Sequence, residues 1–396
     1  MRDRAVGTVA GALGRAFPQS RPTGVPRSIL VLKPCCLGDV VMATPVFASL
    51  RTAFPGARIV LGVGRWSRPA VANNPDLSGV LDCGQVGSGP YGVTDYLRLV
   101  AAVRRSRFDW CLVLDRSPRL ASVPWLAGVP FRAGLDSHGR GFSLQVRVPC
   151  PPDRHESEIY LDVARALGVP ASVDHVVFRP THTDERRVGQ VAESLGLVPE
   201  RPLVVIHPGG GTNPGTTLVA KRWPVERYGE LVGRLVAEVD ATVSLVGGAD
   251  DAELTHAVRK CAVGNLGSDS SAAADDRSAH GSKRTDRIHD LAGQFSLGEL
   301  AALAARAAVY VGNDSGPLHL VSGAGARVIG LYGPTEPERY GPFSPRGRGL
   351  RATFACDCPR VGSFRACRDH RCMLALEVDA VWDAVLKALG DWRAGR

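Results

Sequence analysis

The sequence predicts an α/β protein that contains two doubly wound parallel sheets. Short apolar runs typical of buried strands, such as residues 29–32 and 309–311, alternate with longer segments of helical spacing. Polar turns that contain glycine follow several of these runs, and the alternation occurs in two series, which begin near residues 29 and 203. The 396 residues, 44% of them hydrophobic and 22% charged, suffice for two or three globular domains.

The composition restricts the class of partner. A net charge of +9 favours anionic partners such as phosphorylated sugars, nucleotides or acidic lipid surfaces. No basic run is interleaved with aromatic residues, so nucleic acid is not expected as a partner. No apolar run approaches the length of a membrane span. Six of the ten cysteines are scattered along the chain, singly or as the pair Cys35 and Cys36, which favours the free thiols of a cytoplasmic protein.

Residues 1–27 form an N-terminal extension that ends in prolines and a glycine. Val6, Val9, Leu13 and Phe17 share one face of a helix, which would suit a peripheral anchor on the anionic inner membrane. Glycines within this segment weaken such a helix, and a flexible tail is the favoured interpretation.

The first series opens with a strand at residues 29–32, and a polar turn, a helix over residues 40–54 and a strand at residues 58–63 follow. Asp39 falls at the start of that helix. It is either an N-cap or a base at the carboxyl edge of the sheet that accepts a hydroxyl proton, and its position alone favours neither.

Later loops of the first series bring basic residues towards the same edge. A strand at residues 108–114 ends in a polar turn, residues 132–135 start a further connection, and residues 154–160 lead into a helix that ends at Leu167. The basic residues of these loops are Arg116, Arg119, Arg132, Arg154 and His155. They are candidate acceptor contacts, and solvated surface residues are the alternative.

A polar stretch at residues 181–187 and a helix over residues 188–197 precede the second series, which begins with a strand at residues 203–206. The glycine loop that follows can bring backbone N–H groups close to a phosphate, and Lys221 and Arg222 add positive charge. No G-K-[ST] follows this loop, so it is not a P-loop.

The second series continues with a helix over residues 225–239 and a strand at residues 242–246. Residues 261–287 have no hydrophobic period and predict a disordered insertion. A helix over residues 296–308 follows, with a capping box that starts at Ser296.

Residues 309–335 predict a βαβ unit. A strand at residues 309–311 ends in a polar cluster, Pro317 suits the first turn of a helix, and a strand at residues 328–331 ends in a second polar loop. In open α/β sheets ligands bind at the carboxyl edge where both loops would lie, and the helix start favours an anion. An ordinary N-cap with ordinary turns is the alternative.

Cys356, Cys358, Cys367 and Cys372 lie in a loop-rich segment before a terminal helix over residues 378–392. Four thiolates are candidate zinc ligands. Their spacing is not that of a standard zinc finger, so structural thiols or a redox-active pair are favoured.

Six motifs occur in the order of a known family. They lie at residues 37–40 with Thr44 and Pro45, 207–209, 221–224, 290–293 with Ser296 and Leu297, 312–319, and 332–335. Together they resemble glycosyltransferase family 9, the ADP-heptose heptosyltransferases of lipopolysaccharide core synthesis, over about residues 28–385. Each motif alone is weak, and six in order are specific.

The resemblance implies a GT-B architecture, in which two Rossmann-like domains face each other across a cleft. An acceptor domain would cover residues 28–180, and a nucleotide-sugar domain would cover residues 200–355 with the insertion at 262–287. Residues 356–396 would form the cysteine-rich loop and the C-terminal helix.

The resemblance also implies an inverting transfer that requires no metal or other cofactor. The donor would be ADP-heptose, and the acceptor would be a hydroxyl group of a lipopolysaccharide core or related glycolipid, in the cytoplasm or at the inner membrane face. The sequence contains no D-x-D motif, which agrees with this, because enzymes that hold a diphosphate through a divalent cation usually carry acidic ligands for it.

The site residues follow from the same resemblance. Asp39 matches the proposed base, and Lys221 would stabilise the leaving ADP. The donor contacts would be His207, Gly209, Gly210, Gly211, Thr212, Arg222, Leu291, Ala292, Gly293, Asp314, Ser315, Gly316 and His319. The acceptor contacts would be Lys33, Gly38, Arg116, Arg132 and His155. For His319 a packing role is favoured, and Trp223 is expected to pack beneath the phosphate loop.

Some residues depart from the family pattern, among them the run of Pro34, Cys35 and Cys36 and the pair Gln294 and Phe295. These departures leave the donor base and the acceptor open. The alternatives are another nucleotide sugar such as a UDP-hexose, a small-molecule acceptor, and a non-catalytic sugar-nucleotide-binding protein with a structural zinc site.

Overall fold

The computed structural model describes residues 17–22, 24–87, 89–198, 200–213, 216–268, 283–353, 367 and 370–395. The chain divides into two units, Met1–Val177 and Phe178–Arg396, and each contains one six-stranded parallel sheet. The two predicted doubly wound sheets are thereby confirmed. Within the described residues we find no helix whose length and apolar character would let it cross a bilayer.

The first sheet has the strand order β3-β2-β1-β4-β5-β6, and all its neighbours are parallel. Its strands are β1 (Ser28–Leu32), β2 (Arg58–Val63), β3 (Gly79–Asp82), β4 (Trp110–Val113), β5 (Phe131–Asp136) and β6 (Val146–Pro149). The central strand β1 is apolar and buried along its whole length, as a strand covered on both faces must be.

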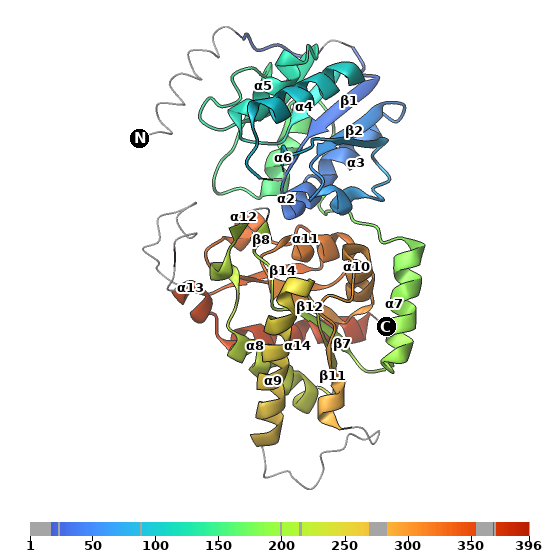
Figure 1. Cartoon of the computed structure of the whole chain (residues 1–396), viewed down its shortest axis with the longest axis vertical. Helices are drawn as coiled ribbons and strands as arrows, with labels where there is room; N and C mark the ends of the chain where they lie inside the picture. Colours follow the sequence, from blue (N-terminus) through green and yellow to red (C-terminus); the bar gives the residue numbers. More distant parts are fainter. Residues whose placement is uncertain are drawn as a thin grey trace. The chain divides into compact units, whose positions relative to one another are not determined.

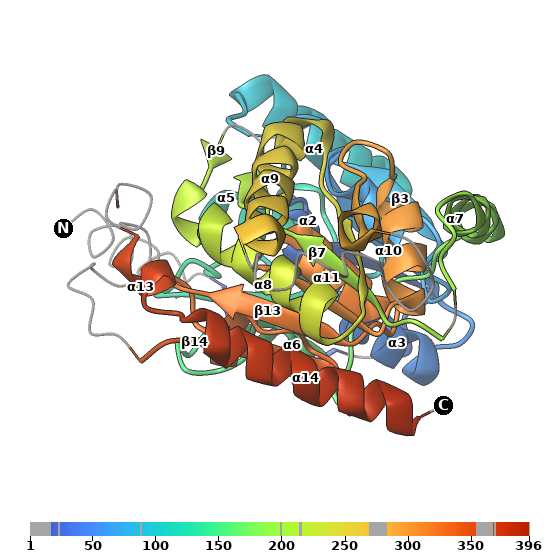
Figure 2. The same cartoon turned by 90° about the horizontal axis from the view of Figure 1, so that it is seen from below.

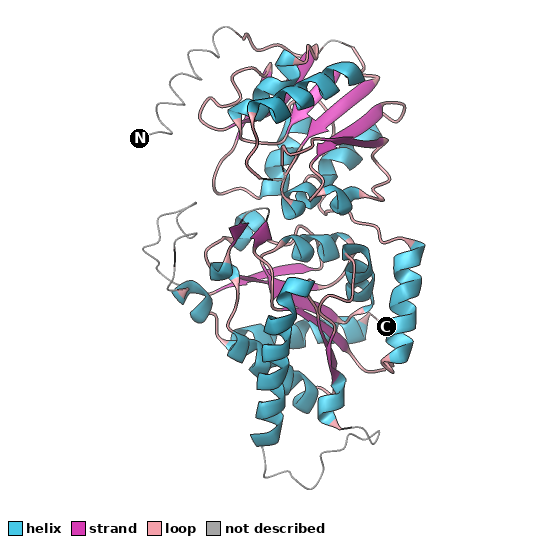
Figure 3. Cartoon of the chain, viewed as in Figure 1, coloured by secondary structure: helices cyan, strands magenta, loops and turns pink. Residues whose placement is uncertain are grey.

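Helices cover both faces of this sheet (Figures 1 and 3). They are α2 (Leu37–Met42), α3 (Thr44–Ala53), α4 (Val93–Ser106), α5 (Pro118–Leu126) and α6 (Glu156–Arg165), with the short 3₁₀ helix η1 (Arg68–Val71). Leu30 and Leu32 share one core cluster with residues of α4 and α5. Because side chains alternate along a strand, Ile29 and Val31 face the opposite side, and α3 packs against α6.

The second sheet has the order β11-β10-β7-β12-β13-β14 and is also entirely parallel. Its strands are β7 (Leu203–His207), β10 (Thr242–Leu245), β11 (Ile288–Asp290), β12 (Val309–Asn313), β13 (Val328–Tyr332) and β14 (Gly347–Arg351). A two-stranded antiparallel pair, β8 (Thr212–Asn213) and β9 (Thr216–Thr217), follows the glycine loop.

The helices of the second unit pack in two groups. They are α7 (His182–Ser194), α8 (Val225–Glu238), α9 (Ala252–Ser268), α10 (Leu297–Arg306), α11 (Gly316–Gly323), α12 (Pro337–Tyr340), α13 (Arg371–Leu374) and α14 (Val378–Ala394), with 3₁₀ turns η2 (Val219–Lys221), η3 (Ala249–Asp251) and η5 (Arg284–Arg287). Helix α8 lies between α9 and α14 (Figure 2), and α10 contacts both α7 and α11.

Both sheets follow the same path. Numbered from the first strand of each unit, the order is 3-2-1-4-5-6, so the direction of winding reverses between β1 and β4 and between β7 and β12. Loops diverge at such a point and leave a crevice at the carboxyl ends of the strands, where ligands bind in open α/β sheets. These two points locate the candidate sites.

Several predicted elements need correction. The helix predicted at residues 40–54 is two helices that meet at Ala43, since Pro45 near the start of α3 has no N–H to continue the first one. Arg132 lies within strand β5 instead of starting a connection. The polar stretch after Thr181 forms the first turns of α7, because Thr181 and Asp184 form a capping box.

The predicted insertion is also shorter than expected. Residues 261–268 belong to α9, and residues 284–287 form η5, so both ends of the insertion are ordered; residues 269–282 lie outside the described residues. The extension likewise has a packed end, because the ring of Phe17 lies edge-on to Trp125 with centroids 5.1 Å apart. The capping box at Ser296 is confirmed.

Candidate functional site

In the first unit, charged side chains gather where β1 and β4 end. Lys33 follows β1, and its ammonium nitrogen lies 3.3 Å from Asp39 Oδ2 and 3.7 Å from Asp115 Oδ2. Burial lowers the pKa of Lys33, but the nearby carboxylates outweigh burial, and the pKa is raised. Lys33 therefore stays charged beside two carboxylates.

Asp39 is the third residue of α2, and Cys36 is the N-cap. Its Oδ2 accepts the N–H of Cys36 at 3.4 Å in addition to its contact with Lys33. The side chain remains 34% exposed, so the carboxylate can also reach a ligand. Asp39 thus caps the start of α2 through its hydrogen bond from the Cys36 N–H. This hydrogen bond does not prevent Asp39 from acting as a base.

Arg116 and His155 lie in the same cluster. Arg116 follows β4 and donates two hydrogen bonds, of 2.5 and 2.9 Å, to the buried carboxylate of Glu156. His155 is the N-cap of α6 and accepts the N–H of Ser157 at 3.1 Å. The charge of Glu156 also contributes to the raised pKa of Lys33. Arg116 and His155 therefore lie close to the pair formed by Lys33 and Asp39.

Arg132 is not part of this cluster. It lies near the start of β5, where its guanidinium donates to the carbonyl oxygens of Ser143 and Val129 at 3.0 and 2.9 Å. Because all strands are parallel, that position is at the amino edge of the sheet, opposite Lys33. The predicted grouping of Arg132 with the other basic residues is therefore wrong, since a strand crosses the sheet between its two loops.

Cys35 and Cys36 form a disulfide in the loop between β1 and α2, and the peptide bond that joins them is cis. The prediction of free thiols is wrong for this pair. Cys83 and Cys111 are free and fully buried, and burial raises the pKa of both thiols.

In the second unit, the glycine loop after β7 is packed on two sides. A Cβ on Gly209 would lie 2.3 Å from Asp251 Oδ1. Gly210 has a φ of +97°, and a Cβ there would lie 2.7 Å from the Cβ of Ser315. The positive φ of Gly210 favours glycine there, and a Cβ on Gly209 would require the Asp251 carboxylate to move. The loop therefore lies between η3 and the start of α11.

Asn313, the last residue of β12, ties this loop to the chain before α8. Its Nδ2 donates to the carbonyl oxygens of Pro208 and Gly209 at 2.7 and 2.9 Å. Its Oδ1 accepts the N–H of Trp223 and the hydroxyl of Tyr228, both at 3.0 Å. The side-chain amide is completely buried and uses all four of these bonds, which fixes both loops.

Lys221 and Asp314 form an ion pair with 2.6 Å between Nζ and Oδ2. Thr335 donates its hydroxyl to the same oxygen at 2.7 Å, and His319 Nε2 lies 3.8 Å from Oδ1. Burial raises the pKa of Asp314, but Lys221 and His319 more than offset burial, so the pKa lies well below its usual range. Asp314 is therefore ionised at neutral pH.

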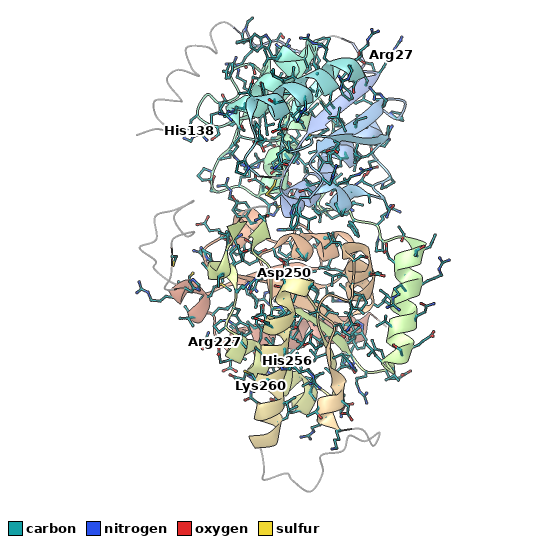
Figure 4. The ribbon with its side chains drawn as sticks, in the orientation of Figure 1. Arg27, His138, Arg227, Asp250, His256 and Lys260 are labelled. Carbon is teal, nitrogen blue, oxygen red and sulfur yellow. A yellow bond between two sulfur atoms is a disulfide. The ribbon has the colours of Figure 1, made fainter. Side chains whose placement is uncertain are left out.

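Asp251 holds a second pair of basic residues. Its carboxylate lies 3.6 Å from His207 Nε2 and 3.4 Å from Arg222 Nη2, and it accepts the N–H of Gly248 at 3.1 Å. Burial raises the pKa of Asp251, but these partners lower it overall. Asp250, labelled in Figure 4, precedes it in η3 at the start of α9.

The other predicted donor contacts lie around these two carboxylates. The loop after β11 is held by hydrogen bonds from Leu291 to Leu245 and from Gly293 to Gly247, with Ala292 between them. The remaining positions are Gly211 and Thr212 at the end of the glycine loop, Gly316 as the first residue of α11, and, in the first unit, Gly38 as the second residue of α2.

The buried polar atoms at this edge that have no hydrogen-bond partner within the described part of the chain include His207 Nδ1, His319 Nδ1 and Ser315 Oγ. Buried polar atoms are normally paired, so these atoms are available to the polar groups of a ligand. Together with Lys221, Arg222 and the start of α11, they suit a phosphate group and neighbouring hydroxyls.

Trp223 lies behind this edge. It is buried, its Nε1–H donates to the carbonyl oxygen of Leu376 at 2.8 Å, and its ring meets Tyr228 edge-on. The predicted packing role is confirmed, and the predicted position beneath the phosphate loop stays a prediction. His319 is also buried, but its unpaired nitrogen leaves both of its predicted roles open.

The cysteine-rich segment is only partly described. Cys356 and Cys358 lie outside the described residues, and Cys372 is buried. The described side chains contain no group of three or more His, Cys, Asp or Glu residues that could hold a metal ion. The preference for structural or redox-active thiols over a zinc site therefore stays a prediction.

The sequence did not single out four residues that hold these sites together: Glu156, Asp251, Asn313 and Thr335. Asn313 and Thr335 lie inside motifs that the sequence does reveal, so the motifs could have found them. Asp251 has a local contact with Gly248, but its basic partner Arg222 is 29 residues away, and Arg116, the partner of Glu156, is 40 residues away.

Comparison with protein families agrees with this geometry. The model of "Glycosyltransferase family 9 (heptosyltransferase)" matches residues 96–362. Among curated proteins, "Lipopolysaccharide heptosyltransferase 2" of Escherichia coli (strain K12) is 27% identical over 334 residues, which cover 82% of this chain and 87% of that protein.

Solved structures show the same fold. The E. coli ADP-heptose lps heptosyltransferase II superimposes with a TM-score of 0.67 at 23% identity, over 92% of this chain and 99% of that one. E. coli heptosyltransferase WaaC with ADP superimposes with a TM-score of 0.63 at 16% identity, over 91% of this chain and 99% of that one. The fold is therefore GT-B-like.

Proposed function

Because the chain belongs to glycosyltransferase family 9, we propose that it transfers a heptose from ADP-heptose to a hydroxyl group of a lipopolysaccharide core or related glycolipid. The observation that carries this proposal is the arrangement at the reversal point of the second sheet. There the glycine loop, the Lys221–Asp314 pair and the start of α11 come together around unpaired buried polar atoms.

The second unit binds the donor in this proposal. The amides of the glycine loop and the start of α11 bind the diphosphate, and Lys221 and Arg222 supply positive charge. Asp314, ionised at neutral pH, accepts hydrogen bonds from the hydroxyls of the sugar. Asp314 holds Lys221 in place before the donor binds, and Asp251 does the same for Arg222. Little reorganisation is therefore needed as charge develops on the leaving ADP.

The first unit binds the acceptor, and Asp39 is the base. The acceptor oxygen attacks the anomeric carbon as the bond from that carbon to the diphosphate oxygen breaks, and Asp39 takes the hydroxyl proton. An ionised carboxylate is a weak base for an alcohol, so the proton moves as the new bond forms. Lys33 and the N–H of Cys36 hold the carboxylate in position. The attack inverts the anomeric configuration and requires no metal.

ADP release tests the proposal. The purified chain is incubated with ADP-heptose and a heptose-acceptor core glycolipid, with and without EDTA. We expect ADP to form in both conditions, and Asp39→Asn to lower kcat by at least about 100-fold, as removal of a general base does. Asp153→Asn, at an exposed carboxylate of the first unit, is the matched control and should leave kcat unchanged.

Three results would overturn parts of the proposal. UDP formed from a UDP-hexose instead of ADP would reassign the donor. Binding of ADP-heptose without turnover, over a broad set of acceptors, would indicate a sugar-nucleotide-binding protein. A full rate in Asp39→Asn would remove Asp39 as the base.

A further inference from the structure

The thiol groups of Cys35 and Cys36 take no part in the function proposed above, although the pair lies two residues after Lys33 and three before Asp39. Both cysteines are partly exposed, whereas Cys83 and Cys111 are buried in the core of the same unit. A reagent in solution can therefore reach this pair but not the other two.

The residue before the pair is fixed. The carbonyl oxygen of Pro34 accepts the N–H of Gly64 at 2.9 Å. On its other side, a Cβ on Gly87 would lie 2.5 Å from the same oxygen, so Gly87 closes tightly on Pro34. The loop therefore cannot shift at Pro34, and any change of backbone conformation in the pair is passed on towards α2.

Cys36, the second residue of the pair, is hydrogen-bonded directly to Asp39. Cys36 is the N-cap of α2; its carbonyl oxygen accepts the N–H of Val40 at 2.9 Å, and its N–H donates to Asp39 Oδ2 at 3.4 Å. The disulfide bridges this cap residue to Cys35, which restricts the backbone of Cys36. Reduction removes that restriction and loosens the contact that positions the carboxylate.

We propose that Cys35 and Cys36 form a reversible modification site for low-molecular-weight disulfides, and that its state controls the position of Asp39. A Cys35 or Cys36 thiolate attacks the small disulfide, forms a mixed disulfide and releases one thiol. The neighbouring thiolate then displaces the second thiol, which closes the Cys35–Cys36 bond. Two protein thiols are oxidised and one small disulfide is reduced to two thiols. An adjacent resolving cysteine is typical of such sites.

The test uses the full-length chain and glutathione disulfide. The reduced protein is treated with glutathione disulfide, and intact mass with alkylation and peptide mapping identifies the bonds formed. Hydrogen exchange then reports the Val40 amide, which donates to Cys36. We expect an intrachain Cys35–Cys36 bond without retained glutathione, reversal by dithiothreitol, and a Val40 amide that exchanges about tenfold more slowly in the oxidised protein.

The rate effect rests on the proposed function, and it is measured separately as ADP release. We expect kcat in the oxidised protein to exceed that of the reduced protein by about tenfold, since small displacements of a catalytic group cost rates of that order. Cys35→Ser with Cys36→Ser should remove this response. Cys261→Ser, at a partly exposed cysteine of α9, should retain it.

The outcomes separate the two proposals. Retained glutathione, absence of the intrachain bond, or equal Val40 exchange in both states would overturn the modification site. ADP release at the same kcat in both states would overturn its control of Asp39. Absence of ADP release in both states, with the bond formed and Val40 exchange changed, would overturn the proposed function alone. If the double variant fails to fold, the single variant Cys35→Ser, which leaves the cap residue unchanged, replaces it. The single variant lacks the resolving thiol, so we expect one glutathione to be retained on Cys36 and no intrachain bond. Loss of that glutathione without added reductant would overturn the proposal.

Discussion

The Lys221–Asp314 pair predicts a specific pH signature of stability. Both side chains are largely buried, and they lie 2.6 Å apart. Lys221→Met removes the cation and leaves Asp314 as a buried carboxylate without its strongest partner. Breaking a buried pair from one side costs about 3 kcal/mol or more. For a unit of this length that corresponds to a decrease in Tm of about 6–12 °C.

The sign of the pH dependence follows from the pKa of Asp314. In the native protein this pKa lies below its unfolded value, near 4, so the pair contributes its full stabilisation above that pH and loses it only as the pH falls further. In Lys221→Met, burial remains without the cation, and the folded pKa rises above the unfolded one. The difference in Tm from the native protein should therefore be largest at pH 8 and shrink towards pH 5.

Differential scanning calorimetry at pH 5, 6.5 and 8 measures this. Lys387→Met, at an exposed lysine of α14, is the matched control and should change Tm by less than about 1 °C. The double variant Lys221→Met with Asp314→Asn should recover part of the lost Tm at pH 8, because the unpaired charge is gone. A Tm of Lys221→Met that matches the native value, or a difference that grows towards pH 5, would refute the reasoning.

Three further predictions concern the polar groups of the two sites. Asp251→Asn should raise the KM for ADP-heptose about tenfold, because it weakens the contacts that position His207 and Arg222 by about 1.5 kcal/mol. Steady-state ADP release measures this KM. Asn313→Asp should lower the free energy of unfolding by about 3 kcal/mol, since it loses two donated hydrogen bonds and buries a charge; urea unfolding measures this, and an unchanged midpoint would contradict it. Arg116→Lys should lower the free energy of unfolding by about 2 kcal/mol, because lysine cannot form both bonds to Glu156; a value within error of native would contradict it.

The fold could be predicted from the sequence because its central strands are continuous apolar runs. Strands such as β1, β7 and β12 are buried on both faces, and the sequence shows this directly. Edge strands were harder: β14 contains two glycines and two arginines, carries no apolar run and was not predicted. Pro45 indicates the break between α2 and α3 at Ala43, but the helical spacing of the apolar residues on either side predicted one continuous helix.

The candidate sites could be predicted only as sets of loops. The sequence places Lys221 and Asp314 in separate motifs, 93 positions apart, so only the fold shows that they form a pair. Arg132 shows the opposite error. Its residue type suits a phosphate or acceptor contact, but whether a residue sits at the amino or carboxyl edge depends on where its strand starts, which local spacing does not define.

The shared strand order makes the chain a tandem of two similar scaffolds, each with an apolar core of its own. Each of these two core clusters is built from residues of a single unit. In the function proposed above, new acceptors can evolve through the first half while the second half keeps its nucleotide sugar. The same independence makes chimaeras a practical route to altered enzymes, with the junction placed at Val177 and Phe178.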